Sequence, residues 1–162
     1  MPVYAPPLRN ASSRGENAWP GLTFAIKSAN QSYVATGLFD VDDLVLLVGA
    51  NTTAIFRFSV QYVSAQVTTG LVLGLNGPVT PDFLSYGVGI ATSQTAAFFS
   101  GSPAFGVGAT GSGSAGPTQP LPAWIDGTIV MGSASGTIGL QAGSETQGTS
   151  ATIMEGSWGW IS

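Results

Sequence analysis

The segment from Thr53 to Val63 constrains the fold most, because its side chains alternate between apolar and polar. The apolar set is Phe56, Phe58, Val60 and Tyr62, and the polar set is Arg57, Ser59 and Gln61. In an extended chain successive side chains point to opposite sides, so the two sets lie on opposite faces. Aromatic and β-branched residues on one face are typical of a half-buried strand. The segment therefore predicts a long strand with Phe58 in the core.

Further short segments have the strand period, and no stretch sustains the helical period of 3.6 residues. They cover residues 22–27, 31–36, 44–48, 70–76, 83–91, 95–100, 124–131, 137–142, 149–155 and 157–161. Turn residues separate them, as in Asn76-Gly-Pro and Gly101-Ser-Pro. Many short strands with closely spaced turns predict an all-β, jelly-roll-like β-sandwich over residues 21–162.

Residues 1–20 differ from the rest, because Pro2, Pro6, Pro7 and Pro20 oppose both helix and central strand. A disordered leader is one interpretation. Large apolar side chains favour instead an extended N-terminal arm that lies along a neighbouring subunit. Its candidate partner-binding residues are Tyr4, Leu8, Arg9, Arg14 and Trp19.

Residues 106–122 form a second unusual segment, rich in Gly and Ser and ending in prolines. Such a composition is typical of a flexible loop or a linker. The 40 residues that follow are too few for an independent core without disulfides or metal. We therefore expect a flexible loop within one domain.

Charge is scarce: 7% of the residues are charged, against about 25% in ordinary soluble domains. A surface with few charges favours permanent oligomerisation or incorporation into a particle. The alternative is a stable extracellular domain that tolerates a neutral surface. The net charge of −4, without a basic cluster, argues against nucleic acid. The apolar run from Leu44 to Val48 is far shorter than the ~20 residues of a spanning helix, so we expect no membrane insertion.

The chain contains no His and no Cys. Imidazole bases, thiol nucleophiles and most zinc sites are thereby excluded, and the sequence predicts neither an enzyme nor a cofactor. The acidic cluster Asp40, Asp42 and Asp43 leaves two interpretations open: a Ca²⁺ site, or a solvated polar start of the strand at Leu44–Val48. The second is favoured, because no glycine-spaced calcium loop is present, and no metal site is predicted.

Three tryptophans lie in the last third of the chain: Trp124, Trp158 and Trp160. Exposed tryptophans bind sugars or proteins, whereas those in alternating strands more often pack in a core or between subunits. The spacing of Trp158 and Trp160 places both rings on one face of a strand that we expect to close the sheet.

The opening Met1-Pro-Val-Tyr-Ala-Pro-Pro lacks the basic start and apolar stretch of a signal peptide. Zero cysteines exclude disulfides. Together these features predict assembly in a reducing cytoplasm.

Four sequence features resemble small structural proteins of tailed bacteriophages: Phe56-Arg-Phe58, Asp126-Gly-Thr128, Ser135-Gly-Thr-Ile-Gly-Leu-Gln141 and Gly156-Ser-Trp158. The resemblance covers roughly residues 53–160 and concerns the closing hairpins of a jelly roll found in head-decoration and tail-fibre proteins. It implies a homotrimer on a virion and no enzyme.

The short chain and its apolar arm favour one role, a capsid decoration (cement) protein on the capsid surface, bound to the major capsid protein or to other virion proteins. Two alternatives remain. One is a tail-fibre or receptor-binding tip, and the other is a carbohydrate-binding module.

Overall fold

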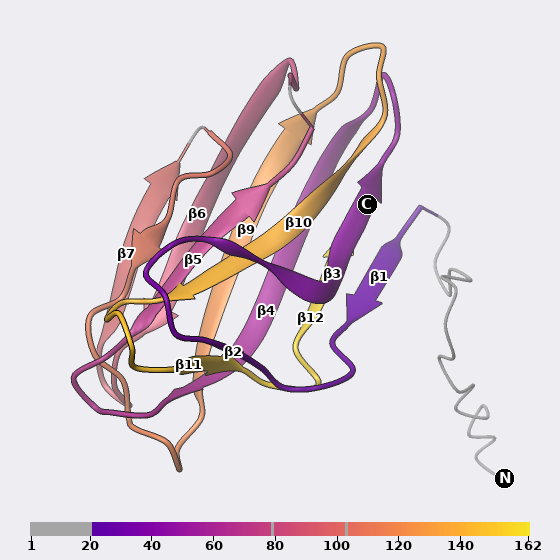
Figure 1. The fold of residues 1–162 in the computed structure, drawn as a ribbon. Coiled ribbons are helices and arrows are strands. Elements are labelled where there is room, and N and C mark those ends of the chain that lie inside the picture. Colours follow the sequence, from indigo (N-terminus) through magenta and orange to yellow (C-terminus); the bar gives the residue numbers. More distant parts are fainter. Residues whose placement is uncertain (1–20, 79, 103) are drawn as a thin grey trace, which may run out of the picture.

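The computed structural model describes residues 21–78, 80–102 and 104–162, and these residues form an all-β fold (Figure 1). The strands are β1 (Thr23–Ile26), β2 (Gln31–Tyr33), β3 (Phe39–Val48), β4 (Thr53–Ser64), β5 (Leu71–Asn76), β6 (Phe83–Ala91), β7 (Ala97–Ser102), β8 (Ala109–Thr110), β9 (Leu121–Val130), β10 (Gly136–Ser144), β11 (Ala151–Ile153) and β12 (Trp158–Ile161). The predicted all-β class is confirmed, and β6 has the predicted bounds. No helix that could cross a membrane occurs among these residues.

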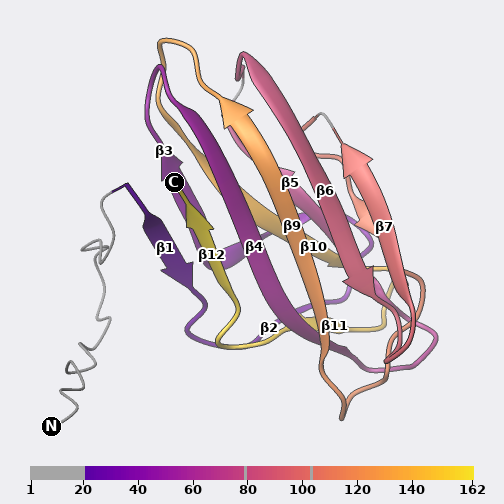
Figure 2. The same ribbon diagram turned by 180° about the vertical axis from the view of Figure 1, so that it is seen from behind.

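Two antiparallel sheets form a sandwich, as Figures 1 and 2 show from opposite sides. Sheet A has the order β1-β12-β4-β9-β6-β7, with β11 also paired to β4 and β2 paired to β11, and sheet B has the order β3-β10-β5-β8. To compare this order with known folds, we set aside β2, β11 and the β6–β7 hairpin and renumber the remaining eight strands 1 to 8 in chain order. Sheet A then has the order 1-8-3-6, and sheet B has the order 2-7-4-5. This is the jelly-roll arrangement of two packed Greek keys. The β6–β7 hairpin extends sheet A at one edge, and β1 forms the other edge.

The core lies between the sheets and contains the apolar face of β4, as the alternation predicted. Phe56, Phe58 and Tyr62 are each at most 2% exposed. Tyr62 donates its hydroxyl hydrogen bond to the carbonyl oxygen of Ala91 at 2.6 Å, which satisfies its polar end inside the core. Burial, with a further contribution from Glu145, raises the pKa of Tyr62 to about 12.

At the start of β3 lies the acidic cluster, which the sequence analysis placed at a junction before the strand. In the structure Asp40, Asp42 and Asp43 lie within β3. The pairing of β3 with β10 shifts register here, and Asp43 has a φ of 67°. Aspartate tolerates this left-handed conformation better than most residues, so the bulge can form inside the strand.

Strands β1 and β2 are joined through a corner that Lys27 fastens to β3. Lys27 is 3% exposed, and its ammonium donates to Gln31 Oε1 at 2.8 Å and to the carbonyl oxygen of Asp42 at 3.2 Å. The same corner interrupts the partner strands β11 and β12, where Ser157 Oγ accepts from the backbone N–H of Gln61 at 3.1 Å. The β1–β12 pair and the β2–β11 pair are therefore separated by this corner, and β2 and β11 continue sheet A on its far side.

The Gly-rich segment 106–122 is attached to the sandwich at several points. It contains β8, which the sequence analysis did not predict and which pairs with β5. Glu145 Oε2 accepts from the backbone N–H groups of Gly70 at 2.7 Å and Gly113 at 3.1 Å. One carboxylate thus joins the start of β5 to the Gly-rich segment.

We expect Glu145→Gln to lower the free energy of unfolding at neutral pH by about 1 kcal/mol, because charge-assisted hydrogen bonds become neutral ones. Burial raises the pKa of Glu145, but the hydrogen bonds from Gly113, Gly70 and Ser112 outweigh it and lower the pKa below 4.5 overall. A lowered folded pKa means that this contribution is full above the unfolded pKa and is lost as pH falls through the folded value.

Urea unfolding of both proteins at pH 7 and at about pH 3 measures this. The difference between them should shrink at the lower pH. An equal difference at both values would contradict a role for the ionised carboxylate.

Candidate assembly surface

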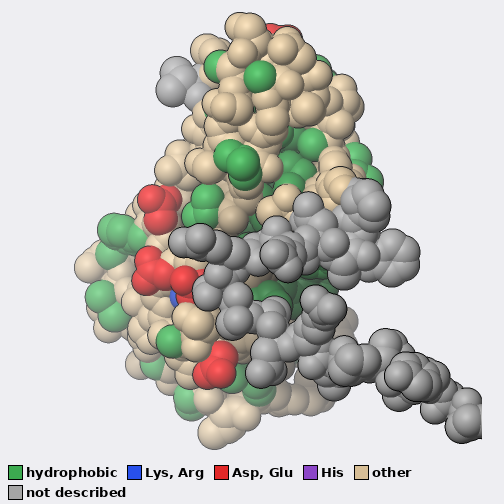
Figure 3. Space-filling view, turned by 90° about the vertical axis from the view of Figure 1, so that its right-hand side faces the viewer, with side chains coloured by type: hydrophobic (Ala, Val, Ile, Leu, Met, Phe, Trp, Pro, Cys, Tyr) green, Lys and Arg blue, Asp and Glu red, His purple; other side chains and the backbone are tan. Residues whose placement is uncertain are grey.

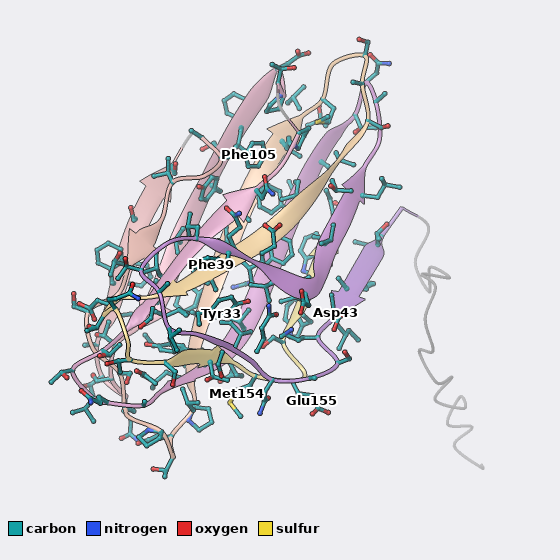
Figure 4. The ribbon with its side chains drawn as sticks, in the orientation of Figure 1. Tyr33, Phe39, Asp43, Phe105, Met154 and Glu155 are labelled. Carbon is teal, nitrogen blue, oxygen red and sulfur yellow. The ribbon has the colours of Figure 1, made fainter. Side chains whose placement is uncertain are left out.

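The carboxylates that could bind a metal or act in acid–base catalysis are dispersed over the fold or already accept hydrogen bonds from neighbouring residues. No group of three or more metal-ligating side chains exists within the described ranges. Asp40 Oδ1 accepts from Gln141 Nε2 at 2.9 Å, whereas Asp43 Oδ2 accepts from the Ser28 hydroxyl at 2.6 Å and from its backbone N–H at 3.1 Å. These hydrogen bonds, and then the charge of Lys27, lower the pKa of Asp43. The members of the acidic cluster therefore accept hydrogen bonds from different neighbours, and Figure 4 labels Asp43 on β3.

Figure 2 views sheet A from its solvent-facing side, here called the outer face. Aromatic residues from several strands are exposed there, among them Phe24, Trp158 and Phe99. The registers align two rows across the sheet from β1 to β7. The first row is Ile26, Trp158, Ser59, Trp124, Gly89 and Phe99. The second row is Phe24, Trp160, Arg57, Asp126, Gly87 and Gly101. Side chains in one row are cross-strand neighbours on the same face.

At the β1 edge these rows form an apolar groove of about 550 Å³. Its lining is Leu22, Phe24, Ile26, Gly156, Trp158 and Trp160. Phe24 and Ile26 are 49% and 56% exposed. Hydrophobic side chains are visible in the centre of Figure 3, which views the molecule from the side where β1 lies. Large apolar side chains gathered around a groove mark an interaction site more often than scattered ones do.

At the opposite end of the first row, Phe99 and Trp124 form an aromatic pair. Their ring centroids are 5.8 Å apart at an interplanar angle of 64°, an edge-to-face arrangement. Trp124 can lie against the sheet because Gly89 has no side chain, and a Cβ there would collide with the indole. Phe99 stays 68% exposed and projects from β7, the edge strand.

Between the groove and the aromatic pair lies one ion pair. Arg57 Nε is 3.1 Å from Asp126 Oδ1, without the alignment of a hydrogen bond, and both side chains are about half exposed. Exposed pairs of this kind add little stability. The pair does, however, leave the centre of the outer face without net charge.

The structure describes only some of the residues that the sequence analysis singled out. Tyr4, Leu8, Arg9, Arg14 and Trp19 lie outside the described residues. Trp158 and Trp160 share one face, as predicted, but β12 lies between β1 and β4 and does not close the sheet.

The sequence analysis did not identify Phe24, Ile26 or Phe99 as surface residues. Each belongs to a segment predicted as a strand. In β1 the alternation favours Phe24 and Ile26 for the core, but the structure buries Ala25 and Lys27 instead. For Phe99 the unusual signal was an apolar residue on both faces of a predicted strand. In β7 the neighbours Phe98 and Phe99 give this signal directly.

No protein-family model matches the chain, and no curated protein does. A solved structure described as "Structure of infectious bursal disease virus Gx strain" aligns with 99% of this chain and 43% of that chain, at 11% identity and a TM-score of 0.28. The chain therefore spans less than half the length of that protein. Similarity at this level establishes neither a shared fold nor a shared function.

Proposed function

We propose that this chain is a non-enzymatic structural protein of a virion, a capsid decoration protein that binds a phage head as a closed homo-oligomer, with a trimer as the expected form. The observation that carries the proposal is the outer face of sheet A, where a 550 Å³ apolar groove and an exposed aromatic pair share one sheet. A chain with 7% charged residues gains from covering such a face in an assembly.

Two further observations support the virion as the assembly. The jelly-roll order of the strands is one that viral capsid domains use, although lectin domains use it too. The sequence features from Phe56 to Trp158 resemble decoration and fibre proteins of tailed phages. The fold and the resemblance agree, and neither depends on the other.

The experiment adds the purified chain to phage heads that lack it. We expect the chain to sediment with the heads and to raise their thermal or osmotic resistance. Failure to bind at saturating concentration would contradict the proposal.

The N-terminal segment gives a separate prediction. Deleting residues 1–20 should leave the domain folded and weaken its attachment to the head, because Tyr4, Leu8 and Trp19 would each contribute about 1.5–3 kcal/mol if buried on a neighbour. The prolines of the segment reduce the entropy lost on docking. Sedimentation with heads measures attachment, and circular dichroism monitors the fold. Undiminished attachment would show that the β-sandwich makes the contact by itself.

A second candidate is a receptor-binding tip or carbohydrate-binding module, and the aromatic pair of Trp124 and Phe99 favours it. Aromatic rings beside polar groups such as Arg57 and Asp126 are suited to stacking against sugars. In this case the isolated chain should bind soluble oligosaccharide, with a change in tryptophan fluorescence that Trp124→Ala reduces. A decoration protein should show no such change.

A further inference from the structure

We propose that copies of this chain associate head to tail, with Phe99 of one copy inserted into the apolar groove at the β1 edge of the next. This inference rests on the proposed function and names the surface that its homo-oligomer uses.

The first argument is the placement of the two features. The groove and Phe99 lie at opposite ends of the same row of the outer face, separated by the full width of sheet A from β1 to β7. With strands about 4.8 Å apart, this separation is about 24 Å. A projecting side chain and a groove at opposite edges of one face can engage only on different copies. Repeating the contact closes a ring when the rotation between copies returns to the first copy, and a rotation of one third of a turn would make a trimer.

The second argument concerns the free edges. Among the described residues, β1 pairs with β12 alone and β7 pairs with β6 alone, so both end strands have an unpaired side. Proteins commonly protect such edges with charge, proline or covering segments. In β1 and β7 the large exposed side chains are instead Phe24, Ile26, Phe98 and Phe99. A neighbouring copy at each edge would cover both.

The third argument is charge, which selects a second copy as the occupant. The chain has a net charge of −4, so two copies repel each other over most of their surface. On the outer face Arg57 balances Asp126. The other described carboxylates lie in β3 or in turns: Asp40, Asp42, Asp43, Asp82, Glu145 and Glu155. Glu155 adjoins Gly156 at one end of the groove, but between the groove and Phe99 the described residues of the outer face carry no unbalanced charge, so like copies can meet there with little repulsion.

Sheet B offers a poorer surface for a second copy. Leu47 and Val45 are exposed on its solvent side, at 65% and 49%. The hollow beside them is small, about 160 Å³, and its lining includes Asp40 and Asn76. Two such surfaces would bring carboxylates together. Leu47 consequently provides a matched control, because it is as exposed as Phe99 and equally apolar.

The test uses the full chain with three single substitutions, Phe99→Asp, Ile26→Asp and Leu47→Asp, sized by analytical ultracentrifugation at micromolar concentration. We expect Phe99→Asp and Ile26→Asp each to raise the dissociation constant about 30-fold or more, as loss of a central interface residue does. Leu47→Asp should leave it unchanged. Circular dichroism confirms the fold, and Phe99→Ala and Ile26→Ala replace any variant that fails to fold.

Mixing supplies the decisive measurement. A Phe99→Asp copy keeps an intact groove, and an Ile26→Asp copy keeps an intact Phe99. Two variants that are monomeric alone should therefore form a one-to-one dimer when mixed, which a groove-to-groove interface would not produce. No dimer on mixing overturns the head-to-tail contact.

The remaining outcomes separate this inference from the proposed function. An oligomer that both substitutions leave intact overturns the inference alone. This would also be the result if residues 1–20 of the same copy filled the groove. Dissociation by Leu47→Asp alone assigns the interface to sheet B and likewise overturns it. A monomeric wild-type chain overturns the inference together with the homo-oligomer, whereas sedimentation with phage heads tests the decoration role independently.

Discussion

Replacing Phe58 with alanine should lower the free energy of unfolding by about 3–5 kcal/mol, the usual loss for a buried phenylalanine. Phe58 is 1% exposed in the middle of β4, with the ring of Phe56 6.4 Å away. Its ring also occupies the space that a side chain at Gly159 of β12 would need. Alanine would leave a cavity between strands that cannot close around it, because both sheets hold their spacing through the other core residues.

Urea unfolding at one fixed protein concentration measures the change, and Ile55→Ala serves as the control. Ile55 lies on the same strand but is 51% exposed, so its replacement should change the free energy by no more than about 0.5 kcal/mol. A loss under 1 kcal/mol for Phe58→Ala would mean that the ring does not support the core.

Replacing Gly70 with alanine should destabilise the protein by about 3 kcal/mol, at the upper end of the usual range for overpacking. A Cβ at Gly70 would collide with the backbone carbonyl oxygen of Gly111 and lie 2.9 Å from the backbone nitrogen of Gly113. Backbone atoms cannot move aside as a flexible side chain can. The substitution would also strain the hydrogen bond from the Gly70 N–H to Glu145, so the Gly-rich segment should detach first.

The matched control is Gly139→Ala in β10, where the nearest atom to an added Cβ is Val45 Cγ2 at 3.8 Å, an ordinary contact. Urea unfolding should show a much smaller change there, and protease cleavage within residues 106–122 should increase in the Gly70 variant alone. Equal stability of the two variants would contradict the close approach of Gly70 to Gly111.

Side-chain alternation accounts for the part of the fold that the sequence predicted. The period of two in Thr53–Val63 identified both the strand and its inner face, and Phe56, Phe58 and Tyr62 are buried as expected. Turn residues located most strand boundaries. These signals are local, so one sequence is enough to show them.

Pairing between distant segments accounts for most of what was missed. The ion pair of Arg57 and Asp126 requires β9 to lie beside β4, and the groove requires β1 beside β12. Neither neighbour can be identified from spacing along the chain. The same is true of β8, where Ala109 is buried because it fits against β5 and the two residues show no apolar period of their own.

The candidate site was therefore predicted only in part. The spacing of Trp158 and Trp160 was enough to predict that they point to the same face of a strand. Whether that face is exposed depends on what covers sheet A, which the spacing does not show. The acidic cluster was placed before the strand because three aspartates disfavour a strand interior. A bulge with Asp43 in a left-handed conformation allows them to lie within it.

The pairing of β1 with β12 also has a consequence for the time course of folding. Thr23 pairs with Ile161, so one of the first described strands waits for one of the last before it gains a partner. Contacts so distant in sequence make folding slow, because the loop between them must close before the contact forms. During synthesis β1 therefore emerges from the ribosome without a strand partner, and its backbone N–H and C=O groups stay unpaired until β12 follows. In this interval a chaperone that binds short apolar segments would find its target at β1, and aggregation of unfinished chains should begin there.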